Sequence, residues 1–335
     1  MANTMRYLVI GLGSMGKRRI RNLQSLGVSD IAGLDPRADR RNEASTKYGI
    51  AAYETLALAL SNFGPQVYII STPPINHMEY AYDGYERGIH CFIEASVVDA
   101  DRILAISSLL PAKGLVMVPS CTMTFYPGPK KIKELLESKS IGQVLNINYQ
   151  TGQYLPDWHP WENIQDFYVS QRNTGGAREI VPFELTWLTD IFGPATALSC
   201  FKAKLSDLPA DIDDTYHCIL RFNTSGVILN LTVEVISQPE ATREMRIIGT
   251  DGVITFSGAR NMVNYISKYS KNWSTFEFAA GTLENNYINP EEPYIDEIKC
   301  FLKAVEAGDA SLFPNSLAAD GNILLTLDAL EQLAG

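Results

Sequence analysis

Three glycines close to the N-terminus have the spacing that brings a peptide backbone against a phosphate. An apolar run, Tyr7–Ile10, forms a predicted strand directly before Gly11-x-Gly13-x-x-Gly16, and the residues after Gly16 continue with helical character. In this context the first glycine permits a tight turn out of a strand, the second lets the backbone approach a pyrophosphate, and the third lets the helix pack on the strand. The anion would lie at the helix N-terminus, where the N–H groups of Ser14 and Met15 point toward it.

A carboxylate follows at the distance expected for a ribose contact. Residues Ile31–Leu34 form a second predicted strand that ends at Asp35, 19 residues beyond Gly16 (35 minus 16). In dinucleotide-binding folds an acidic residue about 20 positions after the glycines binds a ribose 2′-hydroxyl, and its charge repels a 2′-phosphate. The sequence therefore predicts NAD as the cofactor, and Arg37 and Arg40 leave NADP as the alternative.

Helices and strands alternate around this loop as far as residue 121. Further predicted strands are Gln66–Ile70, His90–Ile93 and Leu115–Val118, and the predicted helices between strands are Ala38–Tyr48, Thr55–Leu60, Asn76–Gly88 and Asp99–Leu110. This alternation predicts an α/β domain with a doubly wound parallel sheet of the Rossmann type, which binds ligands at the carboxyl ends of its strands. Besides the glycine loop, Asp35 and Arg37, the predicted cofactor contacts are Ser71, Thr72, Pro73, His77 and Glu94.

From residue 122 the pattern changes to longer, alternating strands. The predicted strands are Val144–Gln150, Thr215–Phe222, Val227–Ile236, Arg243–Gly249 and Val253–Phe256, and the predicted helices are Gly128–Ser138, Pro182–Phe192, Pro293–Glu306 and Ser316–Leu333. Turns between successive strands predict an α+β domain with a large, mainly antiparallel sheet. We therefore expect two domains, 1–121 and 122–335, with the last helix able to pack back on the first. So wide a sheet leads us to expect a homodimer or homotetramer formed through it.

Composition narrows the classes of partner. The formal net charge is -10, which argues against nucleic acid or an anionic membrane surface as a partner. No apolar run approaches the ~20 residues needed to span a bilayer, and the N-terminus runs into the first strand without a secretory signal. Five scattered cysteines without a CxxC pair predict a reduced, cytoplasmic setting. No histidine is spaced with another His or Cys like a metal ligand, so no metal is expected.

The chain resembles the glucose-fructose oxidoreductase and inositol dehydrogenase (Gfo/Idh/MocA) family over nearly its whole length. The resemblance rests on the glycine motif, on Ser71-Thr-Pro-Pro74 with His77, on Glu94 at the family's Glu-Lys-Pro motif and on Gly175-Gly176 before a central helix. The aromatic segment from Gly152 to Glu162 is similar to a subgroup associated with bacterial surface-sugar biosynthesis. The resemblance implies hydride transfer between NAD(P) and a carbinol carbon of a sugar, cyclitol or nucleotide sugar.

Two side chains that the resemblance calls for are absent. The family's Lys polarises the reacting oxygen, and its His, on the helix after the glycine turn, acts as acid or base. These positions are Ala95 and Phe183 here. The family's Asp falls on Ile180 or, with a one-residue gap, on Glu179. We therefore expect an oxidoreductase with a remodelled catalytic centre.

The replacement candidates lie near the same positions. The candidate catalytic residues are Glu184, Tyr126, His159 and Glu179. Glu184 has the alternative of complementing the dipole of a helix that begins near Pro182, and Tyr126 has the alternative of a core position. His159 has carboxylate neighbours in its loop that could tune its pKa. The candidate substrate contacts are Asp157, Trp158, Trp161 and Arg178.

Other functions remain open on the same residues. Loss of the Lys and His also fits a catalytically inactive or regulatory NAD-binding protein. A lyase-type enzyme that uses tightly held NAD transiently is a third alternative. A reductase of a planar substrate, which would tolerate losing both side chains, is a fourth.

Overall fold

The computed structural model describes residues 5–158, 160 and 163–334, and its chain divides into two compact units. The first contains residues 1–122 and 282–322, and the second contains residues 123–281 and 323–335. The sequence predicted one boundary at 121/122. Residues 282–322 thus group with the first unit, although they were expected in the second.

A parallel sheet forms the centre of the first unit. Within the described residues it has six strands in the order β3-β2-β1-β4-β5-β6. Their bounds are β1 Tyr7–Ile10, β2 Ile31–Leu34, β3 Ala51–Tyr53, β4 Val67–Ile70, β5 His90–Ile93 and β6 Met117–Pro119. β1, β2 and β4 are buried at every residue, because helices cover both faces of a doubly wound sheet. The predicted Rossmann fold is confirmed, and β3 is a strand that the sequence reading missed.

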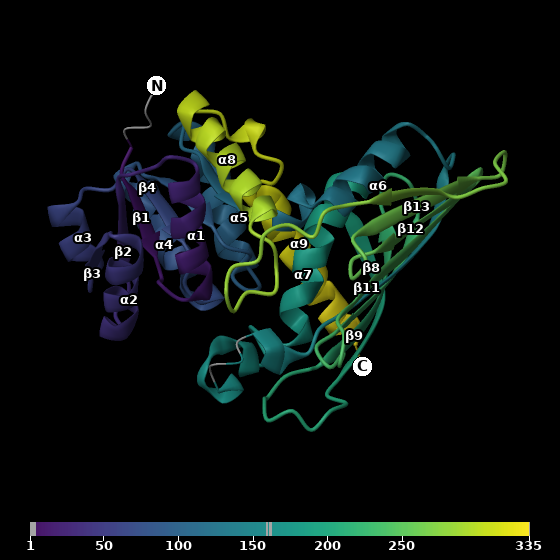
Figure 1. Ribbon diagram of the computed structural model, residues 1–335, viewed down its shortest axis with the longest axis horizontal. Helices are drawn as coiled ribbons and strands as arrows, with labels where there is room; N and C mark the ends of the chain where they lie inside the picture. Colours follow the sequence, from purple (N-terminus) through teal and green to yellow (C-terminus); the bar gives the residue numbers. More distant parts are fainter. Residues whose placement is uncertain (1–4, 159, 161–162, 335) are drawn as a thin grey trace. The chain divides into compact units, whose positions relative to one another are not determined.

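Helices follow the strands in the order expected for this fold (Figure 1). Their bounds are α1 Ser14–Ser25, α2 Ala38–Tyr48, α3 Leu56–Asn62, α4 His77–Arg87 and α5 Ala100–Leu109. α8 (Glu292–Ala307) belongs to the same unit, and α9 (Leu317–Leu333) begins in it.

Contacts of α8 with α1 explain why residues 282–322 belong to the first unit. The Glu291 carboxylate accepts hydrogen bonds from Arg18 (3.0 Å), Arg21 (2.9 Å) and Asn22 (3.0 Å), all on α1. Arg18 and Asn22 are buried, so Glu291 supplies the hydrogen bonds that they would otherwise lack. A single sequence pattern could not reveal this pairing, because the partners lie about 270 positions apart.

A wide sheet organises the second unit. In the described part of the chain its eight strands have the order β14-β13-β12-β11-β7-β10-β9-β8, and every neighbouring pair is antiparallel except β10 with β7. The bounds are β7 Val144–Gly152, β8 Ala195–Ala203, β9 Thr215–Phe222, β10 Ile228–Glu234, β11 Thr242–Gly249, β12 Gly252–Ser257, β13 Met262–Ser267 and β14 Ser274–Glu277. The predicted mainly antiparallel sheet is confirmed. β8, β13 and β14 were not predicted.

One face of this sheet is covered by helices α6 (Pro127–Glu137) and α7 (Ala177–Phe192), as Figure 1 shows. β9 alternates strictly between buried and exposed residues from Tyr216 to Phe222, the pattern of a sheet with one open face. α7 was predicted to begin near Pro182, but it begins at Ala177, directly after Gly176 at φ +64°. Pro182 is tolerated inside the helix at the cost of one backbone hydrogen bond. Among the described residues, no helix is both long and apolar enough to cross a membrane.

Candidate functional site

The glycine loop between β1 and α1 has the geometry predicted for it. Gly11 adopts φ +90°, and a Cβ there would lie 2.6 Å from the Ser71 carbonyl oxygen. A Cβ on Gly16 would lie 1.8 Å from the Gly11 carbonyl oxygen, so that close packing of α1 against the loop requires glycine. A Cβ on Gly13 would meet nothing nearer than the Arg40 guanidinium, at 3.5 Å. Gly13 therefore leaves open space at the start of α1, where Ser14 and Met15 begin the helix and no side chain caps it.

Asp35 lies beside this loop at the end of β2. Its carboxylate accepts hydrogen bonds from the backbone N–H groups of Leu12 and Arg37, both at 2.8 Å. A carboxylate offers about four acceptor positions, so two remain for a ligand hydroxyl. The Arg40 guanidinium lies 3.8 Å from the same carboxylate. The Arg37 side chain instead forms an exposed ion pair with Asp39.

The carboxyl end of β4 also borders the loop. Pro73 is exposed, and His77 is buried at the start of α4. The His77 Nε2 lies 2.9 Å from the Thr72 carbonyl oxygen, which requires this nitrogen to be the donor. Burial lowers the pKa of His77, which favours the neutral imidazole. Two buried polar atoms here, the Thr72 Oγ1 and the His77 Nδ1, have no hydrogen-bond partner among the described residues.

Glu94, at the end of β5, belongs to a buried ionic network. Arg19 donates two hydrogen bonds to its carboxylate, at 2.7 and 2.9 Å, and Ser71 donates a third at 3.2 Å. Arg19 is fully buried, and its remaining nitrogen lies 2.9 Å from Glu297 on α8. Glu297 accepts in turn from the Ser120 hydroxyl at 2.9 Å, at the end of β6. The network fixes the orientation of the Glu94 carboxylate and balances its charge with Arg19.

A buried acid lies behind the loop that follows Glu94. Asp320, in the first turn of α9, is 4% exposed and accepts a hydrogen bond from Ser96. Its Oδ2 has no partner among the described residues. Desolvation by burial raises the pKa of Asp320 to about 7, and the Ser96 hydroxyl partly opposes this rise.

In the second unit, Glu184 is fully buried and lies at the centre of a polar cluster beneath the sheet. Its Oε2 accepts from the Tyr149 hydroxyl (2.7 Å) and the Trp187 indole N–H (2.8 Å), and its Oε1 lies 2.8 Å from Arg243. Burial raises the pKa of Tyr149 well above its ordinary value, so Tyr149 donates as a neutral phenol. The carboxylate thus has a partner for each oxygen and no exposed surface. This is the arrangement of a structural ion pair. Because α7 begins at Ala177, five residues before Pro182 (182 minus 177), Glu184 does not lie in the first turn, where it could complement the helix dipole.

Glu179, in the first turn of α7, has different surroundings. Its Oε1 accepts a hydrogen bond from the Tyr168 hydroxyl at 2.8 Å, whereas its Oε2 has no partner among the described residues. Desolvation by burial raises the pKa of Glu179 to about 7, and the hydrogen bond from the Tyr168 hydroxyl opposes this rise. Near neutral pH this carboxyl group can therefore either accept or release a proton.

The other predicted side chains of this unit are spread over several places. Tyr126 precedes α6, packs against the core and lies close enough to Arg243 to influence its pKa. Asp157 is exposed, whereas Trp158 packs against the core with an indole N–H that has no partner among the described residues. The predicted residues His159 and Trp161 lie outside the described residues, as does Glu162.

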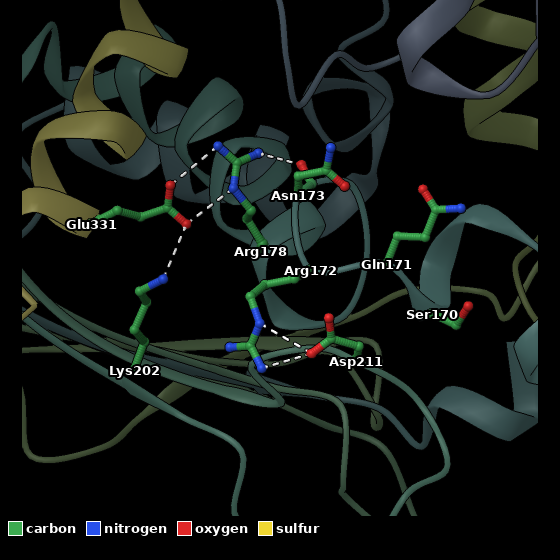
Figure 2. Close-up of a pocket in the computed structure, with 8 residues that line it drawn as sticks. All are labelled: Ser170, Gln171, Arg172, Asn173, Arg178, Lys202, Asp211 and Glu331. Carbon is green, nitrogen blue, oxygen red and sulfur yellow. Dashed lines mark hydrogen bonds and ion pairs between the residues drawn. The ribbon is translucent and has the colours of Figure 1, made fainter.

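Arg178 lines a polar pocket of about 460 Å³ in the second unit, which Figure 2 shows. Its guanidinium forms two hydrogen bonds to Glu331 of α9, at 3.0 and 3.2 Å, and one to the Asn173 carbonyl at 2.9 Å. The remaining lining residues are Ser170, Gln171, Arg172, Lys202 and Asp211. Arg178 is therefore tied to α9, and its cation is balanced within the protein.

Two family models match the chain, one in each of its two units. A family model for the NAD-binding Rossmann fold of an oxidoreductase family matches residues 5–110, and a model for the GFO/IDH/MocA C-terminal domain matches residues 130–255. Together they cover most of the chain. The chain belongs to the Gfo/Idh/MocA oxidoreductase family. Its first unit is an NAD-binding Rossmann domain, as the glycine loop and Asp35 predicted. No curated protein gives a significant match.

Solved structures of other proteins share the fold over nearly the whole chain. An oxidoreductase from Agrobacterium radiobacter, in complex with NAD+, L-tartaric acid and magnesium, has a TM-score of 0.85 at 14% identity, covering 99% of this chain and 96% of its own. A levoglucosan dehydrogenase with NADH and levoglucosan has a TM-score of 0.84 at 18% identity, covering 98% and 97%. A UDP-N-acetylglucosamine 3-dehydrogenase from Acidithiobacillus ferrooxidans has a TM-score of 0.76 at 17% identity, also covering 98% and 97%. At these identities the likeness establishes the shared fold.

Sequence reasoning missed three side chains that organise these sites. Arg19 on α1 forms an ion pair with Glu94 that balances its charge. Arg243 pairs with Glu184, and Tyr168 binds Glu179. Arg243 carried a usable signal, because it shares the apolar face of β11 with Met245 and Ile247, where a charge requires a buried partner. Tyr168 gave no such signal, since it lies in a short 3-10 helix within an irregular segment.

Proposed function

We propose that this member of the Gfo/Idh/MocA family transfers a hydride between NAD and a carbinol carbon of a sugar, nucleotide sugar or related polyol. Glu179 carries the proposal, because its pKa is raised to about 7 and its Oε2 has no partner in the described part of the chain. The family assignment and the sugar dehydrogenases among the solved structures support it. The aromatic segment predicted to contact a sugar, residues 152–162, supports the substrate class.

The residues at the glycine loop fit a dinucleotide. The open space at Gly13 accommodates a pyrophosphate against the first N–H groups of α1. Asp35 keeps acceptor capacity for the adenosine ribose, and the Thr72 hydroxyl is available for a further hydrogen bond. Glu94, paired with Arg19, would be an acceptor for a second ribose. When bound, the nicotinamide supplies or accepts the hydride.

Glu179 would move the proton that accompanies the hydride. In the direction of oxidation, the carbinol hydroxyl donates its hydrogen bond to the Oε2, and its proton passes to this oxygen as the carbonyl forms. The Tyr168 hydroxyl stabilises the ionised carboxylate through the Oε1 and fixes the orientation of the other oxygen. In the direction of reduction, the protonated Glu179 returns the proton. This route uses neither of the side chains replaced by Ala95 and Phe183.

The other predicted residues take supporting roles in this proposal. Glu184 and Arg243 are positioning residues, because their ion pair ties α7, which carries Glu179, to β11. Tyr126 and the predicted His159 would bind substrate hydroxyls. Asp157, Trp158 and Trp161 would bind and stack on a sugar ring, whereas Arg178 would keep α7 in place through Glu331.

Turnover by the full chain tests the proposal directly. The nicotinamide absorbance is followed with NAD or NADH and a panel of sugars, polyols and nucleotide sugars. Glu179→Gln should lower kcat by about 10²- to 10⁴-fold and leave the NAD affinity unchanged. The matched control is Glu240→Gln, an exposed position on the same unit, which should behave as wild type. NAD binding without turnover on the whole panel, or full activity in the Glu179→Gln variant, would overturn the proposal.

The pH profile separates a proton carrier from a structural residue. For substrate oxidation, kcat/KM should rise with pH through about 7, because the base must be ionised. Tyr168→Phe removes a hydrogen bond that lowers the pKa of Glu179. The rising limb should therefore move to higher pH, whereas a purely structural loss would lower the rate at every pH alike.

A non-catalytic NAD-binding protein is the second candidate. Phe183 packs against the core, and Ala95 carries no polar group, so neither position offers the family chemistry. This candidate predicts NAD binding with no turnover in either direction, and no activity after Ala95→Lys with Phe183→His. Any NAD-dependent turnover by the wild-type chain would exclude it.

We also propose that the open face of the eight-stranded sheet is the interface of a homodimer or homotetramer. Phe201 on β8 and Ile219 on β9 are 57% and 39% exposed on this face. Apolar side chains exposed on a broad sheet favour pairing with a second copy. Light scattering on the eluting protein should give a multiple of 37.1 kDa. Phe201→Asp should shift that mass toward one chain, and a monomeric wild type would contradict the idea.

A further inference from the structure

Two of the five cysteines face each other across neighbouring strands. Cys200 on β8 and Cys218 on β9 are direct partners in the antiparallel register. Their sulfur atoms lie 4.0 Å apart. Both side chains point to the covered side of the sheet, with exposures of 7% and 2%. The spacing in sequence gives no hint of the pairing.

The backbone at this place suits a disulfide. Directly opposed residues of an antiparallel pair have Cα atoms about 4.5–5.5 Å apart, and disulfides accept Cα separations of about 4.4–6.8 Å. The two sulfurs need to approach from 4.0 Å to about 2.05 Å, which side-chain rotation can provide. No shift of register is required, because the two residues are already opposite one another.

The surroundings favour reaction at Cys200. A hydrogen bond from Cys218 lowers the pKa of Cys200, and the nearby Lys202 ammonium contributes in the same direction. By contrast, burial raises the pKa of Cys91 and of Cys300. Lys202 lies two residues from Cys200 on the same face of β8 and lines the pocket of Figure 2.

We propose that Cys200 and Cys218 form a reversible dithiol–disulfide site that a hydroperoxide oxidises. The Cys200 thiolate attacks the peroxide oxygen, the O–O bond breaks, and Cys200 becomes a sulfenic acid as water or an alcohol leaves. The Cys218 thiol then attacks this sulfur, the S–O bond breaks, and water leaves with the Cys218 proton. In total, two thiols and one hydroperoxide give one disulfide, one water from the sulfenic acid, and the water or alcohol that left the peroxide. A dithiol reductant reverses the reaction by exchange.

The bond would fasten the edge of the sheet. β8 is the last strand of the order, so β9 is its single strand neighbour within the described sheet. Tyr216 and Lys202 lie next to the two cysteines on the same face, and both contact Glu331 of α9. Oxidation should therefore stabilise β8 together with the pocket beside it. The site is independent of the proposed hydride transfer.

The experiment uses the full native chain treated with hydrogen peroxide, followed by alkylation and mass spectrometry. Alkylation should fall from five sites to three, with a mass loss of about 2 Da for the disulfide. Trypsin should release residues 179–202 and 205–221 as one cross-linked species, which separates on reduction. The Tm of the oxidised protein should rise by roughly 5 °C.

Variants make the assignment specific. Cys200→Ser and Cys218→Ser should each abolish the cross-linked species and the rise in Tm, whereas the control Cys300→Ser should retain both. Absence of the 179–202 to 205–221 species from oxidised native protein would overturn the proposal. So would its formation only after unfolding, or oxidation that stops at sulfenic or higher acids on single cysteines.

Discussion

The ion pair between Glu184 and Arg243 offers a quantitative test of how the second unit is held together. Glu184→Gln keeps the shape of the side chain but removes its charge, leaving the Arg243 guanidinium without its counter-ion. At the observed separation of 2.8 Å, the Coulomb attraction is about 6 kcal/mol for an effective dielectric constant of ~20. Desolvation of both ions offsets part of this energy. Breaking a buried pair by removing one partner costs about 3–5 kcal/mol.

The lower end of that range is expected here. The Arg243 side chain is 18% exposed, so water can partly solvate it once Glu184 is neutral. We therefore expect the free energy of unfolding to fall by about 3 kcal/mol. With a urea dependence of about 2–3 kcal/mol per molar, the midpoint should fall by roughly 1–1.5 M.

Tryptophan fluorescence is the suitable assay for this change. All four tryptophans, at positions 158, 161, 187 and 273, belong to the second unit. Trp187 donates its indole N–H to the Glu184 carboxylate, so its emission reports on the substituted site itself. Unfolding of the second unit is thereby followed without a tryptophan signal from the first.

Two variants calibrate the result. Asp190 lies on α7, as Glu184 does, and forms a partly exposed ion pair with Lys133 of α6. Asp190→Asn breaks this pair and should lower the free energy of unfolding by less than about 1 kcal/mol. Combining Glu184→Gln with Arg243→Met removes the stranded charge and should recover part of the loss. The reasoning fails if Glu184→Gln costs no more than Asp190→Asn, or if the double variant is less stable than Glu184→Gln alone.

Further predictions concern the first unit. Gly13→Ala should keep the wild-type Tm but weaken NAD binding in calorimetry, because its Cβ would fill only the open cradle. Gly16→Ala should lower both, since its Cβ would collide with the Gly11 carbonyl oxygen; equal Tm values for the two variants would contradict this contrast. The raised pKa of Asp320, about 7 against an ordinary value of 3.8, means that the folded state binds the proton more tightly than the unfolded state. Because of Asp320, the free energy of unfolding should fall as the pH rises from about 4 to 7. Asp320→Asn should remove this fall, so that urea titrations at pH 8 show a gain of at most about 4 kcal/mol over the wild type. A variant with an unchanged pH dependence would show that Asp320 ionises freely.

The nucleotide-binding half of the fold could be predicted well from the sequence. The runs at Tyr7–Ile10 and Ile31–Leu34 are short, apolar and bounded by turn residues, so their bounds agreed with the structure. The glycine loop and Asp35 are a local pattern, and the contacts between them are set by the βα unit that contains both. Local patterns of this kind carry their own structural context.

The missed elements lack such local signals. β8 has the sequence Ala-Thr-Ala-Leu-Ser-Cys-Phe-Lys-Ala, in which small residues and a register shift after Ala197 obscure the alternation. Pro182 was interpreted as the start of a helix, but the true start at Ala177 depends on the turn at Gly176, whose amide bonds the Val169 carbonyl.

The candidate site was predictable only in part for a related reason. Arg19, Arg243 and Tyr168 act through partners between 11 (179 minus 168) and 278 (297 minus 19) positions away, and their importance arises from burial that the sheets and helices create together. One sequence can suggest which groups could do chemistry. It does not tell which carboxylates, such as Glu184, are already paired inside the protein.

The discontinuity of the first unit has a consequence for the order in which the chain becomes stable during synthesis. The Ser120 hydroxyl and its acceptor Glu297 are separated by 177 positions, and the same carboxylate forms an ion pair with Arg19. When the ribosome has made only the six parallel strands and their helices, Arg19 on α1 has one counter-ion, Glu94, and lacks the other, Glu297. The first unit is therefore completed only when residues 282–322 have been made. The eight-stranded sheet between the two segments can form before Glu297 binds Arg19.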